Sequence, residues 1–180
     1  QYIRELDLGE TIIVVTADHG DLFGEQGLLS HRLVVDDALT HVPLVVHGAD
    51  GLEASADQLV QQIDLMQTLL GDAGADTGQS QGINLCEETR EYVITERSSE
   101  NFAAHAQQLI SADRSFDLSQ FPPTFLTALR TREFKYTKSD NQESLYRLPN
   151  EELDIKMTYP DVTRQLRMEQ QSWRQSLDTD

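Results

Sequence analysis

An apolar run of β-branched residues, Ile12–Val15, is followed within a few positions by Asp18, His19 and Gly20. Such a run is typical of a strand that is buried on both faces, as in a parallel sheet covered by helices. In open α/β sheets, ligands bind beyond the carboxyl ends of the strands. Because Asp18 and His19 come at that end, we expect them to bind a metal or to move a proton. The alternative is a solvated turn that Asp18 caps.

The stretches around and beyond this strand have the order and spacing of a known family. They are DHG at residues 18–20, DLFGEQGL at 21–28, SH at 30–31, VPLVV at 42–46, QQIDLMQTLL at 61–70, LRTREFKY at 129–136 and SLYRL at 144–148. Together they resemble the sulfatase family of the alkaline phosphatase-like superfamily. The chain departs from the family pattern at Gln67, where proline is usual, and at Arg147, where aspartate is common. The resemblance runs over nearly the whole chain but covers only the carboxyl-terminal part of the family's usual length.

The resemblance implies an α/β fold of the alkaline phosphatase-like type, with the end of a parallel sheet flanked by helices and a small antiparallel α+β subdomain. We expect two domains, residues 1–86 and residues 87–180. The first should contain the end of a helix at residues 1–8, strands at residues 11–16 and 42–46, a helical turn at residues 33–39, and a helix whose apolar stripe faces the core, formed by Leu59, Ile63, Met66 and Leu70. The second should contain short strands near residues 92–95, 125–129, 134–137 and 145–148, and a terminal helix at residues 160–177. Residues 100–119 favour no element and are expected to form a surface excursion.

The resemblance also assigns roles to three residues. Asp18 and His19 match metal-ligand positions, and His31 matches a position that contacts the sulfate of the ester and assists departure of the leaving group. The family usually holds Ca²⁺ among oxygen ligands, which makes Ca²⁺ the first expectation, and an imidazole ligand makes Mn²⁺ the second. The remaining ligands and the formylglycine nucleophile, which arises from a C/S-x-P-S-R motif, are expected outside these residues. Cys86 does not match that motif and is expected to be a buried or linker cysteine.

Three functions remain open from the sequence. The first is a sulfuric ester hydrolase that acts on a sulfate ester of a small molecule or a saccharide, with the isolated chain inactive because it lacks the nucleophile. The second is a phosphonate or phosphate ester hydrolase of the same superfamily, which a plain threonine or serine nucleophile would favour. The third is a truncated relative that acts as a binding or structural module. The sequence does not define the substrate alcohol or the oligomeric state.

The net charge of −17, from 31 acidic and 14 basic residues, limits the classes of partner that the chain can bind. It argues against nucleic-acid binding, which requires a basic surface. No apolar run is long enough to cross a membrane. The acidic residues are dispersed, and the only lysines are Lys135, Lys138 and Lys156. This pattern indicates a halophilic protein, whose self-repulsion salt would screen, although an ordinary acidic mesophilic protein is the alternative.

Overall fold

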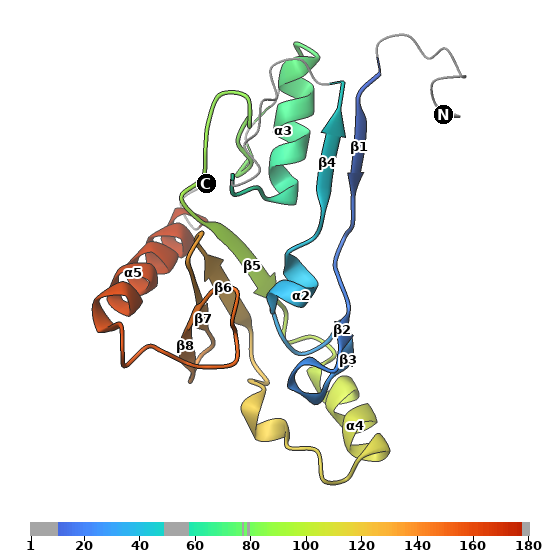
Figure 1. Ribbon diagram of the computed structural model, residues 1–180, viewed down its shortest axis with the longest axis vertical. Helices are drawn as coiled ribbons and strands as arrows, with labels where there is room; N and C mark the ends of the chain where they lie inside the picture. The colour runs from blue at the N-terminus through green and yellow to red at the C-terminus, as the bar shows by residue number, and fades with distance from the viewer. Residues whose placement is uncertain (1–10, 49–57, 77, 79, 178–180) are drawn as a thin grey trace. The chain divides into compact units, whose positions relative to one another are not determined.

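The computed structural model describes residues 11–48, 58–76, 78 and 80–177 (Figure 1). The helix end expected at residues 1–8 lies outside these residues. The chain divides into two compact units, one made of Gln1–His19 and Val42–Arg90 and the other of Gly20–His41 and Glu91–Asp180. Among the described helices, none combines the length and the apolar character that a membrane-spanning helix requires.

The first unit contains the two strands that the apolar runs predict. β1 (Ile13–Thr16) pairs antiparallel with β4 (Leu44–His47), because the chain re-enters beside the end at which β1 finishes, so that Leu44 lies opposite Thr16. The sequence had led us to expect the end of a parallel sheet here, but these two strands are antiparallel to each other. The paired Val15 and Val45 are 57% and 58% exposed. The expectation of burial on both faces is thus wrong for these strands, since a two-stranded ribbon leaves apolar side chains uncovered.

The expected amphipathic helix forms as α3 (Gln62–Asp72), but it buries a different face. Ile63 and Met66, from the predicted apolar stripe, are 42% and 67% exposed. The buried positions of α3 are polar: Asp64, Gln67 and Thr68. The expectation that Met66 fills the core is therefore wrong in the described part of the chain.

The buried face of α3 is polar because the Asp64 carboxylate anchors the segment that follows the helix. It accepts hydrogen bonds from the backbone N–H of Gln61 at 2.8 Å and of Ile83 at 3.0 Å. Arg90 adds a two-pronged ion pair, with Nε 2.8 Å from Asp64 Oδ2 and Nη2 bonded to Oδ1. Paired and hydrogen-bonded in this way, the carboxylate can stay fully buried.

The second unit begins with a short hairpin that packs against a helix. Its elements are β2 (Leu22–Phe23), η1 (Glu25–Gly27), β3 (Leu29–Ser30) and α2 (Asp37–Thr40). The hairpin buries Leu22 and Leu28 in a cluster with Leu33, Leu39 and Phe121. Phe102 and Leu109 of α4 (Phe102–Ala112) pack against this cluster. Residues 100–119 thus contain a helix that contributes to a core, where the sequence had indicated only a surface excursion.

The second unit also contains a four-stranded antiparallel sheet. Its strands follow sequence order: β5 (Val93–Arg97), β6 (Leu126–Arg130), β7 (Phe134–Lys138) and β8 (Glu143–Arg147). The short helix η2 (Leu118–Gln120) precedes β6, and α5 (Pro160–Leu177) ends the described chain (Figure 1). Leu129, Tyr136 and Leu145 of the sheet pack with Leu166 of α5. The expected antiparallel sheet with a terminal helix is confirmed.

Glu143 connects α5 to this sheet. Its carboxylate accepts hydrogen bonds from Arg167 Nε at 2.9 Å, Arg167 Nη2 at 2.6 Å and the Tyr136 hydroxyl at 2.7 Å. The bonds from Arg167 and then from Tyr136 lower the pKa of Glu143. A carboxyl with a lowered pKa in the folded state stabilises the protein above its unfolded-state pKa, and this contribution is lost as the pH falls through the folded-state pKa.

We therefore predict that Glu143→Gln destabilises the chain at neutral pH by about 1.5 to 3 kcal/mol, the range for hydrogen bonds to charged groups. The loss should shrink when the pH falls below the pKa of Glu143, because the wild-type carboxyl is then also neutral. Urea unfolding of both proteins across this pH range measures the difference. An equal difference at every pH would show that the charge of Glu143 has no part in stability.

Candidate metal and catalytic site

Asp18 and His19 leave the end of β1 as adjacent side chains. The Asp18 carboxylate accepts the His19 backbone N–H at 3.0 Å, and its Oδ2 lies 3.7 Å from His19 Nε2. The Asp18 side chain is 89% exposed and that of His19 is 43% exposed. Gln62, at the start of α3, donates to the Ala17 carbonyl and fixes the strand exit. Both predicted metal ligands therefore lie at a strand end with accessible side chains.

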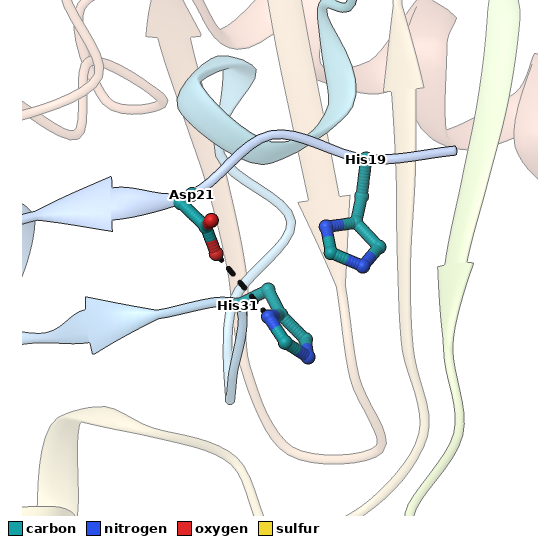
Figure 2. A group of neighbouring side chains, drawn as sticks. All are labelled: His19, Asp21 and His31. Atoms are coloured by element: carbon teal, nitrogen blue, oxygen red, sulfur yellow. Dashed lines mark hydrogen bonds and ion pairs between the residues drawn. The ribbon is translucent and has the colours of Figure 1, made fainter. Parts of the chain in front are cut away.

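Asp21 and His31 form a cross-strand pair at the base of the β2–β3 hairpin. Leu22 lies opposite Ser30 in the ladder, which brings the residues beside them, Asp21 and His31, together. His31 Nδ1 lies 3.2 Å from Asp21 Oδ1 and 3.1 Å from Ser30 Oγ. A carboxylate at this distance orients the ring and favours the tautomer with the proton on Nδ1. Figure 2 shows the His31 ring turned toward Asp21.

The side chains of this segment supply a donor set that suits a divalent cation. One ligand atom from each of His19, Asp21 and His31 lies within 4.8 Å of the others, and His19 is only two residues from Asp21 along the chain (Figure 2). Imidazole nitrogens and carboxylate oxygens together suit Mn²⁺ or Zn²⁺, and carboxylate oxygens suit Ca²⁺. The residues present therefore fit a metal.

Gly20 connects these groups and is held tightly. Its N–H donates to the Leu39 carbonyl at 2.8 Å. A Cβ at residue 20 would lie 2.1 Å from the Ala38 carbonyl oxygen, so no other residue fits without a shift of the backbone. The close approach of Gly20 to α2 therefore determines where the chain runs between His19 and Asp21.

The sequence predicted Asp18, His19 and His31 as site residues but missed Asp21. The structure pairs Asp18 with His19 and pairs His31 with Asp21. The roles given to Asp18, His19 and His31 stay predictions. A signal for Asp21 was present, since it directly follows the DHG stretch. Its pairing with His31 could not be predicted, because strands of two residues are too short to show the alternation of apolar and polar residues that indicates a hairpin.

Cys86 is an exposed free cysteine, which fits the linker alternative and not the buried one. Desolvation, followed by the charges of Asp72 and Glu87, raises the pKa of its thiol. A raised pKa disfavours the thiolate, which is the nucleophilic form of cysteine. Cys86 therefore lacks the environment of a reactive thiol.

The comparisons with known proteins agree with the fold and the motifs. The sulfatase family model matches residues 1–75 of the chain. Arylsulfatase K of Canis lupus familiaris is 29% identical over 175 residues, which are 91% of this chain and 31% of that protein. The resemblance to the sulfatase family is thereby confirmed. The chain spans about a third of the length of this curated relative.

Two solved structures share the fold. A 2-O GAG sulfatase superposes with a TM-score of 0.72 and 24% identity, over 94% of this chain and 37% of that one. A phosphonate monoester hydrolase from Silicibacter pomeroyi superposes with a TM-score of 0.69 and 20% identity, over 99% of this chain and 37% of that one. The expected alkaline phosphatase-like fold is thus confirmed, and the two neighbours represent two kinds of ester hydrolase.

Proposed function

We propose that this chain is the carboxyl-terminal part of a metal-dependent sulfuric ester hydrolase. The observation that carries the proposal is the His31 imidazole, which the Asp21 carboxylate holds at 3.2 Å in the segment that begins with Asp18 and His19. Sulfate-ester cleavage requires positive charge near the sulfate oxygens and a proton for the leaving oxygen. A divalent metal and an oriented imidazole can meet these two requirements. The sulfatase relatives support the assignment.

In this proposal His31 contacts the ester and protonates its leaving oxygen. Asp21 accepts the Nδ1 proton of His31, so a proton delivered to the substrate would pass through Nε2. The side chains of Asp21 and His31 are 52% and 50% exposed, which leaves the ring accessible to a ligand. A protonated ring would also attract the anionic ester.

Asp18 and His19 would hold the metal, with Asp21 as a nearby acidic group. The metal would supply neutralisation of the charge on the sulfate oxygens. Ca²⁺ remains the first expectation and Mn²⁺ the second. The formylglycine nucleophile and the other ligands would come from residues outside this chain, so residues 1–180 alone should hydrolyse no sulfate ester.

The substrate would be a sulfate ester of a small molecule or of a saccharide, as the 2-O GAG sulfatase among the structural neighbours suggests. The phosphonate monoester hydrolase among these neighbours favours phosphonate ester hydrolysis as the second candidate. The deciding experiment compares kcat/KM for an aryl sulfate and an aryl phosphonate monoester. The assay uses a longer protein that contains this chain together with the nucleophile and the remaining metal ligands. A preference for the sulfate supports the proposal, and a preference for the phosphonate contradicts it.

The net charge of −17 supports adaptation to high salt. Repulsion between exposed carboxylates destabilises the folded chain in dilute buffer and is screened by molar salt. We therefore predict that the Tm of the chain rises between dilute buffer and molar KCl. Differential scanning calorimetry measures the change, with sucrose as a control for effects that do not depend on charge. An unchanged Tm in KCl would contradict the halophilic interpretation.

A further inference from the structure

Lys135 is a buried lysine in the middle of the antiparallel sheet. Its side chain is 1% exposed, and its Nζ lies 3.0 Å from Asp37 Oδ1 and 2.8 Å from Glu151 Oε2. Burying an ammonium group is costly unless carboxylates pair with it. Tyr136, the next residue of β7, belongs to the apolar cluster under α5, so Lys135 lies on the other face of the sheet. We call Lys135, Asp37 and Glu151 the Lys135 clamp.

The clamp holds Asp37, the first residue of α2. This short helix has little stability of its own. α2 has only four residues, too few for a helix that must stabilise itself. Its N-cap residue, Asp36, makes no capping bond with its side chain. Glu151 supplies the missing acceptor, because its Oε1 accepts the Asp37 N–H at 2.7 Å. Arg130 adds a further bond, with Nε 2.9 Å from Asp37 Oδ2.

The charges of the clamp act together with its geometry. Burial would raise the pKa of Asp37, but Lys135 and Arg130 outweigh it and lower the pKa of this carboxyl. Burial raises the pKa of Glu151 even though Lys135 opposes the shift. Lys135 therefore favours the charged form of both carboxyl groups against the effect of burial.

The other end of α2 reaches the candidate site. The Leu39 carbonyl accepts the Gly20 N–H at 2.8 Å, and Leu39 itself is 6% exposed in the hairpin core. Gly20 lies against the Ala38 carbonyl so closely that a Cβ would not fit. The position of α2 therefore sets the backbone of Gly20, which directly precedes Asp21.

We propose that the Lys135 clamp is a positioning device for the candidate site, acting through α2 on Gly20 and on Asp21, the residue that follows it. The inference rests on the proposed function, because Asp21 orients the proposed proton donor His31 and is the acidic group near the proposed metal ligands. Lys135 itself pairs with Asp37 and Glu151 and is neither a proposed ligand nor the proposed proton donor. Its effect passes from the sheet to Asp37, along α2 to Leu39 and then to Gly20.

The test uses residues 1–180 with Lys135→Met, Glu151→Gln and, as a control, Lys138→Met, which removes a lysine of the same strand outside the clamp. Two quantities are measured on the folded protein: the NMR amide resonances of Gly20 and Asp21, and the affinity for Mn²⁺ alone by electron paramagnetic resonance. A merely structural role would lower stability but leave both quantities unchanged. We expect both clamp variants to shift the two resonances and to weaken Mn²⁺ binding by roughly 10-fold or more, the usual effect of losing outer supports of a metal site. Lys138→Met should change neither.

Unshifted resonances of Gly20 and Asp21, or an unchanged Mn²⁺ affinity in a wild type that binds the ion, would overturn the positioning role while leaving the proposed function in place. If the wild type binds no Mn²⁺ but the clamp variants shift the resonances of Gly20 and Asp21, the positioning role is supported and the metal site in this chain is not. Should Lys135→Met fail to fold, Glu151→Gln decides the question. This substitution keeps the lysine and replaces one of its two carboxylate partners by an uncharged side chain of similar shape.

Discussion

Replacing His31 by alanine is expected to lower kcat for poor leaving groups by about 10²-fold to 10⁴-fold, the usual contribution of a positioned proton donor. The reason is that an alkoxide needs a proton as it departs, and His31, which Asp21 orients, is the proposed proton donor. An aryl sulfate with an acidic phenol needs little protonation and should lose much less. The measurement is kcat over a series of sulfate esters with graded leaving-group pKa, in a protein that carries this chain together with a nucleophile.

His41→Ala is the matched control for His31→Ala. His41 follows α2 and is exposed, and its backbone N–H completes the helix by bonding the Asp37 carbonyl at 2.9 Å. Removing its ring should leave the leaving-group dependence unchanged. If His31→Ala slowed every ester by the same factor, the proton-donor role would be wrong, and contact with the sulfate alone would account for the loss.

Asp64→Ala is expected to destabilise the first unit by about 3 to 5 kcal/mol, the cost of leaving one partner of a buried ion pair alone. Asp64 is fully buried, and its loss would strand Arg90 and the N–H groups of Gln61 and Ile83. Urea unfolding followed by α3 helicity measures the loss. Asp72→Ala removes an exposed carboxylate from the other end of the same helix and should cost much less. Equal effects of the two substitutions would show that Asp64 is not an anchor.

The apolar runs predicted most of the strands and α5, because burial of β-branched and aromatic side chains determines these elements locally. The bounds of α5 agree with the predicted range, since Pro160 begins the helix and apolar residues recur along it. α4 was missed although Phe102, Ala106 and Leu109 have helical spacing, because neither a basic residue in its last turn nor a glycine after it marks its end. Local patterns therefore predict an element when both its face and its ends carry signals.

The polar contacts could not be predicted because they join residues that are far apart in the sequence. Asp64 lies inside an apolar stripe, and its partner Arg90 comes 26 residues later. Lys135 is buried through Asp37, which lies 98 residues earlier in the chain. Asp21 meets His31 only because Leu22 pairs with Ser30 in a very short hairpin. The motifs predicted Asp18, His19 and His31 as site residues, whereas Asp21 and the groups that hold the surrounding backbone depend on the tertiary fold.

The roles of Asp18 and His31 are separated most directly by metal content. Asp18 is proposed to bind the metal, and His31 is proposed to act on the ester, although its ring also lies near the ligand atoms of His19 and Asp21. Atomic emission analysis of a protein that carries this chain together with the remaining ligands should find about one divalent ion in the wild type and in His31→Ala, and almost none in Asp18→Ala, because a hard cation loses an anionic oxygen ligand. Retention of the ion in Asp18→Ala, or its loss in His31→Ala, would contradict these roles.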